Sequence, residues 1–301
     1  MRKPKIGLAL GSGGARGWAH IGVIRALEER GIVPDVVVGT SMGALVGAAY
    51  VGGQLDALEK WARSITLRKM AGLIDVNLLS GGLVEAKHVV RFFQSLEMPE
   101  RIEELDIAFA TVATDMRSGR EIWIQDGSII DAMRASIALP GIVSPVLRAE
   151  HWLLDGGLTN PLPVSVCRAM GADIVIGVNP EAKEYGVMWS QPPETPNEAW
   201  KAIKKSMPLP VRGVFEAVSG VGKVNGIRIP NYFDVVATSI DVMIAQIRRS
   251  RLISDPPHVL LEVELHDFSL LDFHNAAAAI DKGRACVERS GEMLESILKG
   301  A

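Results

Sequence analysis

Two glycine-rich turns, each between an apolar strand-like run and a helical pattern, constrain the fold of this chain more than any other feature. The first turn spans residues 11–17 and follows the apolar run 6–10, and the second spans residues 39–43 and follows the β-branched run 36–38. Strands that are apolar on both faces are typical of a parallel sheet with helices on each side. We therefore predict an α/β fold, a three-layer α/β/α sandwich with a mainly parallel central sheet.

The rest of the chain is predicted to extend this fold within a single domain, 1–301. Two hairpins, a helix followed by a strand, a late strand and a long C-terminal helix are indicated by residues 107–124, 143–154, 163–178, 259–265 and 275–298. The core would occupy about 5–180, and a C-terminal strand and helices would occupy 231–301. Residues 181–230 are rich in proline with little periodicity, which predicts a loop or flap insertion.

The composition excludes several classes of function. A net charge of -3 and a pI near 6.1 lack the basic character of a nucleic-acid-binding domain. Cys167 and Cys286 lie in apolar helical patterns, as buried cysteines do, and the six scattered histidines predict no metal site.

No targeting or membrane-spanning segment is expected. The apolar run after Lys5 is too short for a signal peptide. The uncharged stretch 36–55 is interrupted by five glycines, which favours a buried strand and a packed helix over a membrane span. We predict a cytoplasmic protein, and the pattern indicates no particular oligomeric state.

The second turn has the pattern G-x-S-x-G, with Ser41 at its centre. Between a strand and a helix, this pattern makes a sharp turn that presents the serine hydroxyl above the sheet. Ser41 is therefore the candidate nucleophile, and such a nucleophile needs a base and an oxyanion site.

The first turn can supply backbone donors. Successive glycines at 11, 13, 14 and 17 let N–H groups converge at a helix N-terminus, where they bind a phosphate or a developing oxyanion. The spacing also approaches a dinucleotide fingerprint, but the strand at 36–38 leads into Gly39, Thr40 and Ser41 with no acid to bind a ribose. An oxyanion loop beside a nucleophile turn accounts for both motifs.

The base is less evident from the residues. His258, His266 and His274 do not lie in a turn beside a catalytic acid, as a Ser-His-Asp triad would require. Asp155 ends the apolar run 152–154 and precedes two glycines, a pattern that is also typical of an ordinary turn.

These three stretches, in this order, resemble the patatin-like phospholipase family. They correspond to its glycine-rich oxyanion loop, its G-x-S-x-G and its D-G-G/A motif. The strings at 7–18, 135–141 and 271–274 resemble the bacterial RssA-like branch, and the likeness covers nearly the whole chain.

The resemblance implies a patatin-like fold and a Ser-Asp dyad, with Ser41 as nucleophile and Asp155 as base. Gly13 and Gly14 would donate to the oxyanion, and Arg16 would steady the loop or the phosphate of the substrate. Ser12 departs from the third glycine of plant members. An unperturbed Asp is about 2.6 pK units less basic than His, a deficit that the oxyanion donors would have to offset.

The activity implied is that of a serine lipid acyl hydrolase, a phospholipase A or lysophospholipase-type esterase without metal or cofactor. Its partner would be a phospholipid or other lipid ester, reached through peripheral contact with a membrane. The alternative is a regulatory adaptor or membrane-surface module with a weak or vestigial site.

Overall fold

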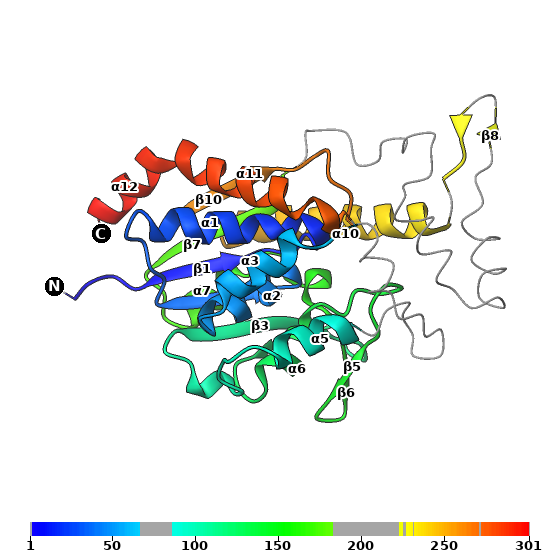
Figure 1. The fold of residues 1–301 in the computed structure, drawn as a ribbon, viewed down its shortest axis with the longest axis horizontal. Coiled ribbons are helices and arrows are strands. Elements are labelled where there is room, and N and C mark those ends of the chain that lie inside the picture. Colours follow the sequence, from blue (N-terminus) through cyan, green and yellow to red (C-terminus); the bar gives the residue numbers. More distant parts are fainter. Residues whose placement is uncertain are drawn as a thin grey trace.

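A computed structural model describes residues 2–66, 86–182, 223–224, 227–230, 232–270 and 272–300. Its central sheet has eight strands in the order β10-β7-β1-β2-β3-β6-β5, with β4 also paired to β3 (Figure 1). The strands are β1 (Ile6–Leu10), β2 (Val36–Thr40), β3 (Ala108–Asp115), β4 (Glu121–Ile124), β5 (Val146–Arg148), β6 (His151–Asp155), β7 (Ile174–Ala182) and β10 (Val259–Glu264).

The sheet is mixed, and its two parts differ in the way the chain connects them. Strands β10, β7, β1, β2 and β3 pair in parallel, whereas β4, β6 and β5 join antiparallel. Every residue of β1 and β2 is buried, as expected for strands covered on both faces. The mainly parallel sheet predicted from sequence is thus confirmed for the part that carries the two glycine-rich turns.

Helices cover both faces of the sheet. The longer ones are α1 (Ala19–Glu28), α2 (Met42–Val51), α3 (Leu55–Arg63), α5 (Lys87–Gln94), α6 (Ile129–Ser136), α7 (Val164–Ala169), α10 (Tyr232–Ser254), α11 (Ala276–Arg289) and α12 (Gly291–Gly300). Short 3-10 helices are η1 (Gly14–Trp18), η3 (Ile102–Glu104), η4 (Gly156–Leu158) and η5 (Phe273–Asn275). Alternate strand residues enter two separate cores, which makes the predicted three-layer sandwich.

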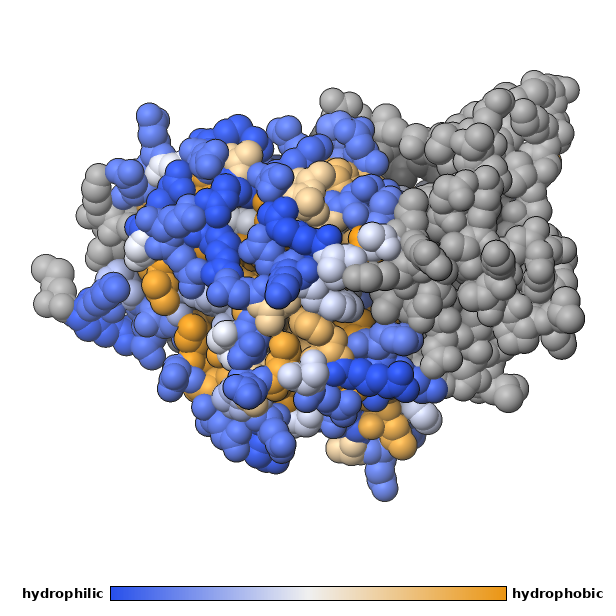
Figure 2. Space-filling view, viewed as in Figure 1, coloured by the Kyte–Doolittle hydropathy of each residue, from blue (hydrophilic) through white to orange (hydrophobic). Residues whose placement is uncertain are grey.

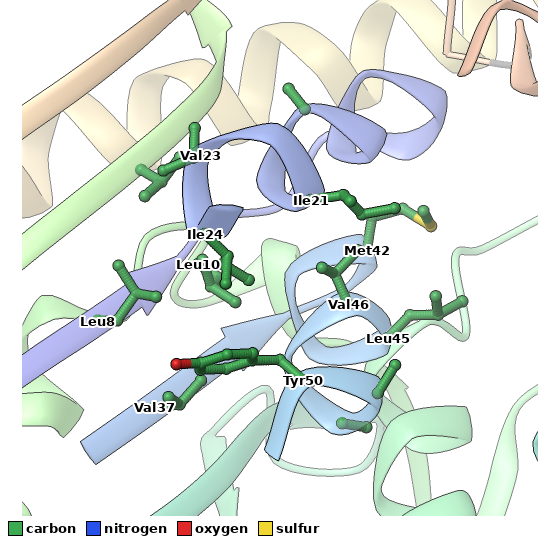
Figure 3. Packing of buried hydrophobic residues seen from close by; sticks show 14 of the residues in the cluster. Leu8, Leu10, Ile21, Val23, Ile24, Val37, Met42, Leu45, Val46 and Tyr50 are labelled. Atoms are coloured by element: carbon green, nitrogen blue, oxygen red, sulfur yellow. The ribbon is translucent and has the colours of Figure 1, made fainter. Parts of the chain in front are cut away.

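The larger core lies between the sheet and the helices α1 and α2. Leu8 and Leu10 of β1 point toward Ile24 of α1, and Val37 of β2 lies next to Tyr50 of α2 (Figure 3). This packing holds both helices against β1 and β2, and each helix follows the end of one of these strands in the chain. The two glycine-rich turns lie at the ends of β1 and β2 that lead into these helices.

Helices α1 and α11 pack with their backbones in contact, side by side in Figure 1. A Cβ atom built on Gly283 of α11 would lie 2.1 Å from the carbonyl oxygen of Ala19, and one on Gly22 of α1 would lie 1.9 Å from that of Ile280. The outer side of α11 is mostly hydrophilic (Figure 2). The contact needs glycine on both helices.

Replacing Gly283 by Ala is therefore expected to destabilise the protein by about 2 kcal/mol, because a methyl group forces these helices apart. Gly291→Ala is the matched control, since a Cβ there meets only the side chain of Arg30 at 3.9 Å. Urea unfolding followed by circular dichroism measures both. Equal stability of the two variants would contradict the backbone contact.

Two predicted elements have different bounds in the structure. The helix predicted over 275–298 is two helices, α11 and α12, separated at Ser290, whose N–H and hydroxyl both bond back to the carbonyl of Cys286. Such a serine followed by glycine interrupts a helix. The strand predicted to end at Val178 continues to Ala182, so β7 enters the predicted insertion 181–230. Most of that insertion lies outside the described residues, apart from its ends and the hairpin β8 (Lys223–Val224) and β9 (Ile227–Arg228).

Candidate active site

Ser41 occupies the sharp turn between β2 and α2. Its φ of 56° and ψ of -123° lie in a region that residues other than glycine rarely adopt. The following helix approaches β1 closely, since a Cβ built on Gly43 would lie 2.1 Å from the carbonyl oxygen of Leu10. The G-x-S-x-G pattern therefore forms the strained strand-turn-helix connection that the sequence predicts.

Strand register brings the ends of β2 and β6 together. Strand β3 pairs with β2 as far as Thr40↔Val112 and with β6 from Asp155↔Ala113. Strand β4 pairs with residues 111–114 of β3, a range that overlaps the residues paired with β2 and those paired with β6. Because a strand has two edges, β4 occupies one edge of β3, and β2 and β6 share the other. Because Val112 and Ala113 are consecutive, β2 and β6 meet head to head. This places Ser41, the residue after Thr40, beside Asp155.

The two side chains are in direct contact. The hydroxyl of Ser41 donates to Oδ2 of Asp155 at 2.6 Å, and the N–H of Gly157 donates to Oδ1 at 2.7 Å. Asp155 is 1% exposed and Ser41 is 8% exposed. Both carboxylate oxygens are thus oriented, one by the hydroxyl and one by the 3-10 helix that begins at Gly156.

Burial changes the basicity of this carboxylate. It raises the pKa of Asp155 from 3.8 to about 7, against the hydrogen bonds from Ser41 and Gly157, which lower the pKa, and Glu181 raises it further. A pKa near 7 is close to that of an ordinary histidine, about 6.5. The deficit in basicity expected from the sequence is therefore largely removed by desolvation.

The glycine-rich loop lies against β7, the segment that follows Asp155 and the segment before η5. Gly11 N–H donates to Val178 O at 3.0 Å, Ser12 N–H to Pro161 O at 2.8 Å, and Ala15 N–H to Leu270 O at 2.9 Å. Gly14 has a left-handed φ of 54°. Among the described residues, neither the N–H of Gly13 nor that of Gly14 donates to a backbone carbonyl in a turn, loop or helix cap. These are the two predicted oxyanion donors.

Arg16 lies inside the protein and is 1% exposed. Its guanidinium donates to Glu181 at 3.2 Å and to Asp241 at 3.3 Å, and its Nε donates to the carbonyl of Gly13 at 3.2 Å. Of the two roles considered for Arg16, this geometry suits support of the loop, because its charge is already paired with the carboxylates of Glu181 and Asp241.

Several residues around the dyad were not singled out from sequence. The N–H of Ser41 donates to the hydroxyl of Ser136 at 2.9 Å, and that hydroxyl donates to Val112 O at 2.6 Å. Thr40 Oγ1 donates to Asn160 O at 2.9 Å, which ties the turn to the segment after Asp155. Ser136 lies in the string 135–141, which marked it as part of the resemblance but gave it no role.

The histidines have other positions. The ring of His20 lies 2.8 Å from Gly11 O, and burial lowers its pKa to about 4, so it is neutral at pH 7. His258 Nδ1 accepts from Val175 N–H at 2.9 Å. The partner of the Ser41 hydroxyl is a carboxylate.

A family model described as patatin-like phospholipase matches residues 8–168 and includes every predicted site residue. An uncharacterised NTE family protein of Mycobacterium bovis is 31% identical over 97% of this chain and 92% of its own length. Patatin-like phospholipase domain-containing protein 6 of Homo sapiens is 37% identical over 58% of this chain, which is 13% of that protein. The chain belongs to the patatin-like phospholipase family.

Among solved structures, VipD from Legionella pneumophila covers 98% of this chain and 67% of its own, with a TM-score of 0.47 and 16% identity. Family membership supports a lipid hydrolase function with a lipid as substrate. The RssA-like branch is compatible with these relatives and stays a prediction. In the part of the chain that is described, every helix is too short or too polar to cross a membrane.

Proposed function

We propose that this protein is a serine lipid acyl hydrolase that cleaves carboxylic esters with a Ser41–Asp155 dyad. The observation that carries this proposal is the 2.6 Å hydrogen bond between the Ser41 hydroxyl and a buried carboxylate, made at a strained turn. A positioned base within hydrogen-bond reach is what a serine nucleophile requires. The raised pKa of Asp155 gives that base the proton affinity the reaction needs near pH 7.

The reaction would proceed in two acyl transfers. Asp155 takes the Ser41 proton as the serine oxygen attacks the ester carbonyl, and the N–H groups of Gly13 and Gly14 bind the resulting oxyanion. Collapse breaks the bond to the alcohol oxygen, which leaves with the proton from Asp155. Water, deprotonated by the same carboxylate, then attacks the acyl-enzyme and releases a fatty acid. The substrate would be a phospholipid or another lipid ester, reached from the cytoplasm through peripheral membrane contact.

Covalent labelling tests the nucleophile without any assumption about the lipid. A fluorophosphonate reacts when a serine oxygen displaces fluoride from phosphorus, so wild type is expected to carry one adduct on Ser41 by mass spectrometry. Asp155→Asn should slow labelling by about 10²- to 10⁴-fold, the usual contribution of a general base. Ser95→Ala is the control, because its exposed hydroxyl donates to Phe92 O and lies outside the proposed site. An adduct on a different serine, or none, would contradict the proposal.

A further inference from the structure

Four charged side chains, three buried and one partly buried, form a network beside the glycine-rich loop. Arg16 comes from η1, Glu181 from the end of β7, and Asp241 and Arg248 from α10. Their side chains are 1%, 4%, 14% and 9% exposed. Two positive and two negative groups balance one another, and such burial is tolerated when each charge is paired. The dyad reaction uses none of these side chains directly.

Glu181 joins the two arginines. Its Oε1 accepts from Arg16 at 3.2 Å, and its Oε2 accepts from Arg248. Arg248 also donates to the backbone carbonyl of Glu181 at 3.5 Å, and Asn179 Oδ1 accepts from the N–H of Glu181 at 3.0 Å. The carboxylate is therefore held on both oxygens, and its backbone is fixed as well.

The network ends on one peptide group of the loop. The carbonyl of Gly13 accepts from Nε of Arg16 and from its backbone N–H, each at 3.2 Å. This carbonyl and the N–H of Gly14 belong to the same planar trans peptide, so they point in opposite directions. Fixing the Gly13 oxygen on Arg16 therefore sets the direction of the Gly14 N–H. That direction decides whether the N–H can reach a developing oxyanion.

The loop also lies directly on the residues around Glu181. A Cβ atom built on Gly13 would lie 2.7 Å from Cγ of Pro180 and 3.5 Å from Cγ of Glu181. Hence a shift of Glu181 would be transmitted to the loop both through Arg16 and through the contact of Gly13 with the side chains of Pro180 and Glu181.

We propose that Glu181, anchored by Arg248 of α10, is the positioning residue that aims the oxyanion donors of the glycine-rich loop through Arg16. This inference deepens the proposed function and rests on it for its kinetic test. Among the described residues, the Glu181 carboxylate accepts from Arg16 and Arg248, whereas the Ser41 hydroxyl bonds to Asp155, so Glu181 acts by holding Arg16. Helix α10 would therefore help to position the oxyanion donors, although neither residue of the dyad belongs to it.

The charge of Glu181 gives a second measurement, the pH dependence of kcat/KM, which a purely structural role would leave unchanged. Glu181 raises the pKa of Asp155. Among the described residues, the charged side chains that contact Glu181 are Arg16 and Arg248, and Asp241 lies on the other side of Arg16. Removing the negative charge of Glu181 also leaves the positive charges of Arg16 and Arg248 less compensated. Both effects lower the pKa of Asp155. The acidic limb of kcat/KM against pH should therefore move to lower pH in Glu181→Gln.

The experiment compares wild type, Glu181→Gln and Glu59→Gln with a soluble nitrophenyl ester. Glu59→Gln is the control, because it removes a carboxylate from a partly exposed ion pair with Arg63 on α3. For Glu181→Gln we expect kcat to fall about 10²-fold with KM little changed, as for a small misplacement of reacting groups. The acidic limb should shift as above. Asp241→Asn removes the charge of the more exposed carboxylate that binds Arg16, so it should reduce kcat less than Glu181→Gln does. It replaces Glu181→Gln as the test variant if that protein does not fold.

Hydrogen exchange separates this inference from the proposed function, because it requires no turnover. Glu181→Gln should speed amide exchange in a peptide covering 11–18 and leave one covering 42–51 unchanged. If wild type shows no Ser41-dependent hydrolysis, the proposed function fails while the exchange result still decides the positioning role. Unchanged exchange in 11–18, or an unchanged kcat and pH profile in an enzyme that does turn over, would overturn the inference.

Discussion

At pH 9 the Asp155→Asn variant is expected to be more stable than wild type, although its ester hydrolysis is almost lost. Burial raises the pKa of Asp155 to about 7 from 3.8, so the folded state favours the neutral carboxyl. The resulting stability is present below pH ~4, falls as the pH rises toward 7, and stays lost above the folded pKa. At about 1.4 kcal/mol per pK unit, keeping the carboxylate ionised costs about 4 kcal/mol above pH 7. Asn does not bear that cost.

The same substitution removes the base. Activity should fall about 10²- to 10⁴-fold, and in wild type kcat/KM should rise with pH through about 7 and then level off. Urea unfolding across the pH range, beside initial rates, measures both effects. Asp173→Asn is the control, and its effect on stability should change with pH in the opposite direction. The reason is that the pKa of Asp173 is lowered, chiefly by the hydrogen bond from the backbone N–H of Lys5. A stability difference between Asp155→Asn and wild type that does not grow with pH would contradict the buried, proton-binding carboxylate.

Gly43→Ala should lower stability and hydrolysis together. A Cβ there would lie 2.1 Å from Leu10 O and 2.8 Å from Gly11 O, which are backbone atoms at the start of the oxyanion loop. The α2 helix must then move away from β1, which we expect to cost about 3 kcal/mol by overpacking. Separation of the Ser41 turn from the loop should reduce kcat about 10²-fold.

Gly47→Ala is the matched control for Gly43→Ala, one turn further along α2. The three atoms nearest to a Cβ on Gly47 are side-chain atoms, at 3.1 Å in Phe109 and 3.4 Å in Leu10 and Val37. Alanine also favours a helix by about 1 kcal/mol over glycine, which offsets mild crowding. Thermal unfolding and initial rates of the two variants test this contrast. Equal effects at both positions would show that the close approach at Gly43 is not what the turn needs.

The sequence was sufficient where chemistry is encoded locally. A strand, a G-x-S-x-G turn and a helix are consecutive in the chain, so Ser41 and its conformation follow from neighbouring residues. Asp155 is different, because D-G-G alone is typical of an ordinary turn and only the resemblance gave it a role. Its position beside Ser41 depends on the register of β2 and β6 along β3, which local patterns do not encode.

Residues that act across the fold could not be predicted from local patterns. Glu181 binds Arg16 from 165 residues further along the chain, and Arg248 binds Glu181 across 67 residues. Neither Glu181 nor Arg248 lies in a motif. Their roles depend on the position of α10 beside the loop, where Asp241 of α10 contacts Arg16. Local sequence patterns do not predict such a contact. The break between α11 and α12 was missed because Ser290 fits an amphipathic pattern, while its hydroxyl bonds back to Cys286 O.

Fatty-acid release from mixed phospholipid micelles, by wild type and by Ser41→Ala, tests the central claim most directly. Ser41→Ala retains the turn and removes only the oxygen that contacts Asp155. We predict steady release by wild type and none above background by the variant, with both proteins equally folded. Release that persists in Ser41→Ala, or no release from wild type with short-chain esters also untouched, would contradict the account and favour the regulatory adaptor.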